Sequence, residues 1–95
     1  MSLPVTFDPG AQDDLEKLEE YLAQRFYPNN AAKYVRRILE ACLAIGTAPY
    51  RGHTRDDIRP GVRAVGFEKR VTITFEVQAD RVMILGVFYA GRLPH

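Results

Sequence analysis

The stretch RVTITFEVQADRVMILGVFY, residues 70–89, decides the fold. Its first part, residues 70–77, alternates polar and apolar side chains, which predicts a strand with one buried side and one solvent-facing side. Residues 78–81 are short enough to form a hairpin turn. Residues 82–89 are apolar or glycine throughout, as expected of a central strand that is packed on both faces. The stretch therefore predicts two neighbouring antiparallel strands at the centre of a sheet.

Two further strands are predicted outside this hairpin. Residues 62–67 form one of them, and a loop with two prolines and a glycine, residues 47–60, precedes it. Residues 3–7 form a short apolar strand near the start of the chain. Pro4 lacks a backbone N–H, so this strand is expected at an edge of the sheet or with its first residues outside the pairing. The sheet is thus expected to have four strands.

Two amphipathic helices are predicted between the first strand and the loop. In residues 11–26 the apolar side chains recur every three or four positions, at Ala11, Leu15, Leu18, Leu22 and Phe26. Residues 30–45 carry a similar apolar face. Asn29 or Asn30 is expected to cap this second helix, and Gly46 to end it in the left-handed conformation. The short connection predicts an antiparallel helical hairpin.

The predicted fold class is α+β, with the order β-α-α-β-β-β. The helical hairpin must bury its apolar stripe against one face of a small, mostly antiparallel four-stranded sheet. The 95 residues are enough for a single domain, residues 1–95. The 46% of apolar and 26% of charged residues are typical of a globular chain and exclude disorder as the starting assumption.

Several classes of site and location are not expected. The one cysteine, Cys42, allows no internal disulfide, and its place on an apolar helix face predicts an inert thiol. His53 and His95 are the two histidines and have no second ligand at metal-binding spacing, so no metal site is expected. Neither a cofactor-binding loop nor an apolar run of the roughly 20 residues needed to span a membrane is present. A cytoplasmic protein without cofactor is the expectation.

Charge is concentrated in the middle of the chain. Residues 51–70 hold six Arg or Lys against three Asp or Glu, whereas residues 1–50 hold five against seven. Arg63, Arg70 and Arg92 fall on or beside predicted strands. The planar guanidinium pairs well with phosphate or carboxylate oxygens, which favours a binding role for an acidic partner. The alternative interpretation is a solvated face that keeps the sheet soluble, and the charge pattern leaves both open.

Five segments, in this order and at these spacings, resemble the ParE branch of the RelE/ParE toxin superfamily over essentially the whole chain. They are DDLEKLEEYLAQR (13–25), YPNNAAKYVRRILEACLAI (27–45), APYRG (48–52), GVRAVGF (61–67) and VMILGVFYAGR (82–92). The resemblance implies a compact β-α-α-β-β-β toxin that is encoded beside a neutralising antitoxin, with growth arrest and plasmid stabilisation as its biological effects. ParE-like proteins are taken to poison DNA gyrase, whereas RelE-like relatives cleave mRNA in the ribosome.

The residues that RelE-like ribonucleases use are only partly present. Cleavage by a 2′-hydroxyl needs a base, an acid and cations at the developing charge. Against the RelE pattern, Val65 and Thr72 stand where basic residues are expected. If the chain is nevertheless a ribonuclease, its candidate catalytic residues are Arg63, Arg70, Arg92 and His95. The incomplete set favours a ParE-like toxin that acts by binding, and enzymatic activity is not expected.

The resemblance also implies partners. The target, DNA gyrase, would be contacted by Arg63, Arg70 and Arg92. A ParD-like antitoxin with an acidic, partly disordered tail would fold onto apolar surface of the helical hairpin and the sheet, with contacts at Tyr21, Tyr34 and Tyr50. Core packing of these tyrosines is the alternative, and a detoxified relative that only binds its antitoxin is a third functional hypothesis. A homodimer or a toxin–antitoxin hetero-oligomer is expected.

Overall fold

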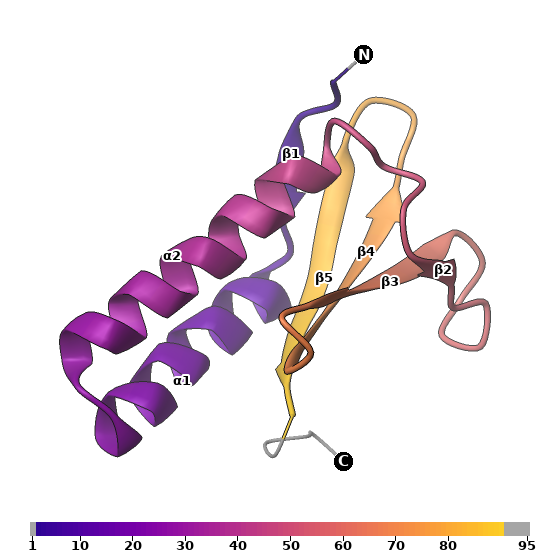
Figure 1. Cartoon of the computed structure of the whole chain (residues 1–95). Coiled ribbons are helices and arrows are strands. Elements are labelled where there is room, and N and C mark those ends of the chain that lie inside the picture. Colours follow the sequence, from indigo (N-terminus) through magenta and orange to yellow (C-terminus); the bar gives the residue numbers. More distant parts are fainter. Residues whose placement is uncertain (1, 91–95) are drawn as a thin grey trace.

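Two helices cover one face of a five-stranded sheet in the computed structural model, which describes residues 2–90 (Figure 1). The elements in chain order are β1 (Val5–Phe7), α1 (Pro9–Arg25), α2 (Pro28–Ile45), β2 (His53–Thr54), β3 (Val62–Phe67), β4 (Val71–Val77) and β5 (Val82–Tyr89). The strands lie in the order β1-β5-β4-β3-β2. Strand β1 runs parallel to β5, and every other pair is antiparallel. The α+β class and the helical hairpin are confirmed.

The number of strands corrects the sequence prediction. The expected loop contains the two-residue strand β2, in which His53 pairs with Ala64 and Thr54 with Arg63. Gly52, immediately before it, has φ of +74°, and a Cβ at that position would clash with the carbonyl oxygen of Ala64. Glycine therefore lets the loop approach β3 closely enough to add a short edge strand. The sheet has five strands where four were expected.

A bulge in the central hairpin keeps the apolar residues of β5 on the helix side. Strand β4 pairs with β5 in a register that shifts between Thr74 and Phe75, which leaves Leu85 without a direct partner. Because Leu85 is an extra residue in β5, Ile84 and Val87 point to the same face of the sheet although they are three residues apart, and both pack in the core. Thr74 was expected on the wet face but is only 5% exposed. Its hydroxyl donates to the Gly86 carbonyl, in a crowded stretch where the Phe88 ring folds back over Gly86.

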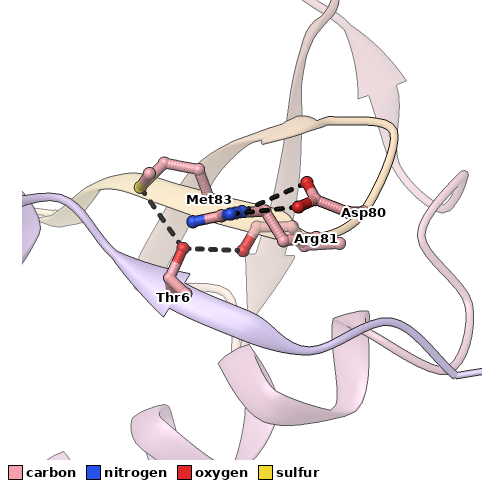
Figure 2. Close-up of polar contacts among 5 residues, drawn as sticks. Thr6, Asp80, Arg81 and Met83 are labelled. Carbon is pink, nitrogen blue, oxygen red and sulfur yellow. Dashed lines mark hydrogen bonds and ion pairs between the residues drawn. The ribbon is translucent and has the colours of Figure 1, made fainter.

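Strand β1 is fastened to the start of β5, as Figure 2 shows. The Thr6 hydroxyl lies 3.5 Å from both the Val82 carbonyl oxygen and the Met83 Sδ. The turn before β5 is held by Arg81, whose guanidinium donates two hydrogen bonds to the Asp80 carboxylate. Strand β1 covers only residues 82–84 of β5, and it is an edge strand as predicted.

The ends of the helices differ in part from the predictions. The Asp8 carboxylate caps α1 by accepting a 2.9 Å hydrogen bond from the Gly10 N–H. Helix α2 begins at Pro28 with Tyr27 as its N-cap residue and has no side-chain cap, so the expected asparagine cap is wrong. Pro28 suits the first helical position because its missing N–H would have no partner there.

Gly46 ends α2 in the right-handed region, with φ of −59° and ψ of −27°, so the predicted left-handed stop is also wrong. A Cβ at this position would clash with the carbonyl oxygen of Leu3. The Leu3 N–H donates a 2.8 Å hydrogen bond to the Gly46 carbonyl. Glycine is needed here because the segment before β1 passes so close to residue 46 that a side chain would not fit.

The core lies between the helical hairpin and the sheet. Its largest fully buried side chains include Leu18, Ile38, Ile73, Phe75 and Ile84. Cys42 is completely buried in the same cluster. Neither described helix is long and apolar enough to cross a membrane. This core fixes the helix ends and the β3–β4 turn around the site described next.

Candidate functional site

A cavity of about 370 Å³ opens between the α1–α2 connection and the turn that joins β3 to β4. Its apolar and aromatic wall consists of Leu22, Phe26, Ala31, Tyr34 and Tyr89. Its polar rim consists of Asn30, Glu68 and Arg70. An apolar recess with a few polar groups at its mouth is the usual form of a binding site in proteins. The volume is in the range of sites that accept one or two side chains or a small ligand.

Three tyrosines and a phenylalanine form a row along the helix-facing side of the sheet. Ring centroids are 6.2 Å apart for Tyr21 and Tyr89, 6.3 Å for Tyr34 and Tyr89, and 6.3 Å for Tyr34 and Phe67. The Tyr34–Tyr89 pair meets edge to face, which is a favourable geometry for aromatic rings. All four rings are partly buried against the core. Two of the three tyrosines predicted to contact an antitoxin, Tyr21 and Tyr34, thus belong to one row.

Arginines lie over both ends of this row. The Arg25 guanidinium is 4.6 Å from the centroid of the Tyr21 ring. The Arg37 guanidinium is 6.0 Å from the Tyr34 ring and 5.8 Å from the Phe67 ring, and it also forms an ion pair with Glu68. Cations over ring faces are attracted by the negative potential there. The surroundings of the cavity are therefore cationic, with Arg70 as a further positive charge on the rim.

The β3–β4 turn presents Arg70 to the cavity. Residues 68–70 join the two strands, and both Glu68 (φ 50°) and Lys69 (φ 65°) are in the left-handed region. Residues other than glycine adopt this conformation at a cost, so other interactions must hold the turn. The Arg37–Glu68 ion pair ties it to α2, and the Ala90 N–H donates to the Arg70 carbonyl.

The phenol of Tyr34 is neutral at physiological pH. Burial raises its pKa above the ordinary value, and the neighbouring Tyr89 acts in the same direction. The positive charges of Arg37 and Arg70 act in the opposite direction on this pKa. Tyr34 consequently remains a hydrogen-bond donor that can serve a carboxylate or carbonyl group in the cavity.

Arg63 lies in a different environment from Arg70. Its guanidinium donates to the carbonyl oxygens of Tyr50 at 2.8 Å and Arg51 at 3.1 Å, and more weakly to that of Gly52 at 3.5 Å. It also lies 5.8 Å from the Tyr50 ring centroid. Arg63 therefore fastens the loop before β2 to β3. Tyr50, the third tyrosine predicted to contact an antitoxin, is 73% exposed at this second location.

The structure does not bring Arg63 and Arg70 together. Arg63 pairs with Phe75, whereas Arg70 precedes Val71, the partner of Phe67. Phe67 lies four residues beyond Arg63, so the two positions are at least about 13 Å apart along the strand direction. Arg92 and His95, the other predicted site residues, lie outside the described residues. The proposed grouping of arginines on one wet face is thus not found for the two that are described.

Two residues that complete the cavity, Phe26 and Tyr89, were not predicted from the sequence as site residues. Tyr89 was assigned only to the apolar run of the last strand, yet it contacts both Tyr21 and Tyr34. Phe26 was counted as a core residue, but it is 59% exposed at the cavity mouth. Both residues could have been suspected because they are aromatic and stand at the ends of predicted elements, Phe26 just before Tyr27-Pro28 and Tyr89 at the end of the last strand. Residues 2–90 contain no cluster of three or more His, Cys, Asp or Glu side chains placed to hold a metal.

The sequence profile of the ParE toxin of the type II toxin–antitoxin system parDE matches residues 5–94. The chain belongs to the ParE toxin family. The match covers every element of the fold and the whole of the described cavity. A search of the curated proteins gives no significant match.

Solved structures share the fold of this ParE-type toxin at low sequence identity. The chromosomal ParDE toxin–antitoxin system from P. aeruginosa contains a chain with a TM-score of 0.81 and 22% identity, covering 94% of this chain and 97% of that one. A chain of the toxin–antitoxin complex RelBE2 from Mycobacterium tuberculosis gives 0.67 and 17%, covering 94% and 99%. A conserved hypothetical protein from Helicobacter pylori gives 0.50 and 15%, covering 95% and 97%.

Proposed function

We propose that this ParE-type toxin acts by binding DNA gyrase and is neutralised by a cognate, ParD-like antitoxin. The observation that carries the proposal is the family match over residues 5–94. Gyrase works on DNA in the cytoplasm, so the toxin would act there and arrest growth when its antitoxin is absent.

Two positions in the sheet support binding over RNA cleavage. Val65, where RelE-like ribonucleases resemble one another in having a basic residue, pairs with Ile73 and packs against the core. Thr72, at a second such position, is exposed and pairs with Gly66. Neither side chain can stabilise negative charge on a phosphorane as a cation would. The described cations instead surround a recess that is suited to holding a partner.

A supercoiling assay tests the proposed target. Relaxed plasmid, purified gyrase and ATP are incubated with increasing amounts of the toxin, and the products are separated before and after denaturation. Accumulation of cleaved plasmid, or loss of supercoiling, at toxin concentrations comparable to that of gyrase is expected. Heat-denatured toxin serves as the control. Unchanged supercoiling and no cleaved plasmid at saturating toxin would refute gyrase as the target.

The alternative activities give different results. Primer extension on mRNA from cells that express the toxin would show discrete cuts within translated codons if the chain were a RelE-like ribonuclease. Cuts of that kind together with an unaffected gyrase would replace the proposal by the ribonuclease hypothesis. Normal growth after expression without antitoxin would instead support a detoxified relative.

The antitoxin is expected to cover apolar surface at the α1–α2 connection, the closed end of the helical hairpin. Tyr27 and Phe26 are 77% and 59% exposed there. Exposed aromatic clusters are typical of interaction sites. The RelBE2 match is itself a chain of a toxin–antitoxin complex, which supports a stable complex here too. Co-expression with the product of the adjacent gene should yield a hetero-oligomer on size exclusion, and two non-associating proteins would contradict this partner.

A further inference from the structure

We propose that the cavity between the α1–α2 connection and the β3–β4 turn binds a short partner segment in which a carboxylate neighbours a large apolar side chain. The carboxylate pairs with Arg70, and the apolar side chain enters the recess between Leu22, Ala31 and Tyr34. The inference rests on the proposed control of the toxin by an antitoxin, and it names the chemistry by which that partner is recognised.

Arg70 is a positive charge at the rim that no carboxylate of the described residues pairs with. Arg37 is paired with Glu68, and Arg25 lies over the Tyr21 ring. Within residues 2–90 no carboxylate forms an ion pair with the exposed Arg70. Its guanidinium can therefore offer a planar pair of donors to an incoming carboxylate, and such charge-assisted bonds are the strongest hydrogen bonds in proteins.

The interior of the cavity, directly beside this charge, is apolar. Leu22 is 4% exposed and Ala31 is 1% exposed, and both belong to the hydrophobic core, so the floor of the recess is formed by tightly packed side chains. Phe26 stands at its mouth and is more than half exposed. A large apolar side chain in this space would bury Phe26 and remain in contact with the ring of Tyr34. Peptide recognition commonly combines apolar anchors of this kind with a specific polar contact.

A protein segment fits this site better than single-stranded nucleic acid. Bases bind by stacking on free aromatic faces, but guanidinium groups already lie over the rings of Tyr21 and Tyr34. The Glu68 carboxylate on the rim would also repel a run of phosphates. A single partner carboxylate that pairs with Arg70 avoids this repulsion, because the charge of Glu68 is balanced by Arg37. The charge pattern is thus complementary to an isolated acidic residue within an apolar sequence.

The test is a titration of isotope-labelled toxin followed by NMR. The probe is a capped hexapeptide that alternates glutamate with leucine and phenylalanine, and the matched peptide has glutamine in place of glutamate. The acidic peptide is expected to shift the amide signals of Leu22, Ala31 and Tyr34 and to bind at least about tenfold more tightly than the neutral one. Equal binding of both peptides would overturn the proposal.

Variants assign the binding to Arg70. Arg70→Gln is expected to weaken the acidic peptide by about tenfold and to leave the neutral peptide unchanged. Arg70→Lys should recover part of the affinity because it keeps the charge without the planar fork. Arg36→Gln is the matched control, since Arg36 is exposed and lies on the side of α2 opposite to Tyr34. Unchanged binding by Arg70→Gln, with the fold intact by circular dichroism, would overturn the assignment.

Two further measurements test other occupants of the cavity and distinguish a failure of the gyrase proposal from a failure of the cavity proposal. Stronger shifts of the same amides with a short oligothymidylate, or on raising the toxin concentration alone, would replace the peptide by nucleic acid or by a second copy and overturn the proposal. Peptide binding that depends on Arg70, in a toxin without effect on gyrase, would refute only the gyrase target. Gyrase poisoning by a toxin whose cavity ignores the acidic peptide would refute only the cavity inference.

Discussion

The backbone N–H of Val87 donates a 3.0 Å hydrogen bond to the Asp14 carboxylate of α1, and this bond links the helix to the part of β5 that β1 leaves uncovered. Strand β1 ends too early to pair with Val87, so without Asp14 this N–H would lack its partner. Asp14→Ala should lower the free energy of unfolding by about 1–3 kcal/mol, because it leaves a partly buried donor unsatisfied. Urea unfolding measures this loss.

The neighbouring residue provides a matched control for this prediction. Asp13 is exposed on the same helix turn and forms an ion pair with Lys17 at 2.7 Å. Exposed pairs of this kind contribute little, so Asp13→Ala should change the unfolding free energy by less than about 0.5 kcal/mol. Similar losses for the two variants would mean that the Asp14–Val87 bond has no special role.

Burial controls the chemistry of Cys42. It raises the pKa of the thiol to about 12, so the reactive thiolate is almost absent at neutral pH. The raised pKa stabilises the fold fully at pH values below the thiol pKa of the unfolded chain, and this contribution is lost as the pH rises towards about 12. A thiol reagent at neutral pH should label the unfolded chain rapidly and the native protein only as fast as it opens. Immediate labelling of native protein would contradict the buried position.

At the scale of elements, the β3–β4 turn keeps two left-handed residues that are not glycine. Lys69, with φ of 65°, makes none of the ion pairs found among residues 2–90, whereas Glu68 is tied to Arg37. Lys69→Gly should therefore raise the free energy of unfolding by about 0.5–1 kcal/mol, since relief of the backbone strain exceeds the extra entropy of glycine in the unfolded chain. Thermal and urea unfolding measure the change.

At Gly52 the reverse substitution, from glycine to alanine, is expected to destabilise the protein in the same unfolding measurements. Its φ is +74°, and an added Cβ would clash with the Ala64 carbonyl. Gly52→Ala should lower the unfolding free energy by more than about 1 kcal/mol and loosen β2. If Lys69→Gly also destabilised the protein, the turn conformation would not be the strained one described.

The elements show how far local sequence determines this fold. Strands β3, β4 and β5 and both helices were predicted within two residues of their bounds, because period-two and period-3.6 patterns are local signals. Strand β2 was missed because two residues carry no pattern and their pairing depends on β3, ten residues further along the chain. Gly46 was misjudged for a similar reason, since its role depends on the distant Leu3.

At the scale of the whole molecule, the candidate site could be predicted only in part. Tyr21 and Tyr34, two of the tyrosines predicted to contact an antitoxin, lie in one aromatic row, and that contact remains a prediction. The cations could not be grouped from sequence, because the face on which a residue lies depends on register and on the turn. Arg63 is paired with Phe75, whereas the turn at residues 68–70 directs Arg70 to the cavity.

This division of the arginines predicts two separable phenotypes. Arg63 bonds to three loop carbonyls, so Arg63→Gln should lower the unfolding free energy by about 1–3 kcal/mol. Arg70 has no ion pair within residues 2–90, so Arg70→Gln should change stability by less than about 0.5 kcal/mol while weakening the complex with the co-expressed antitoxin. Urea unfolding and co-purification at increasing salt measure the two effects. Equal destabilisation by both substitutions would mean that Arg70, like Arg63, serves the fold, and the cavity would lose its proposed anion-binding residue.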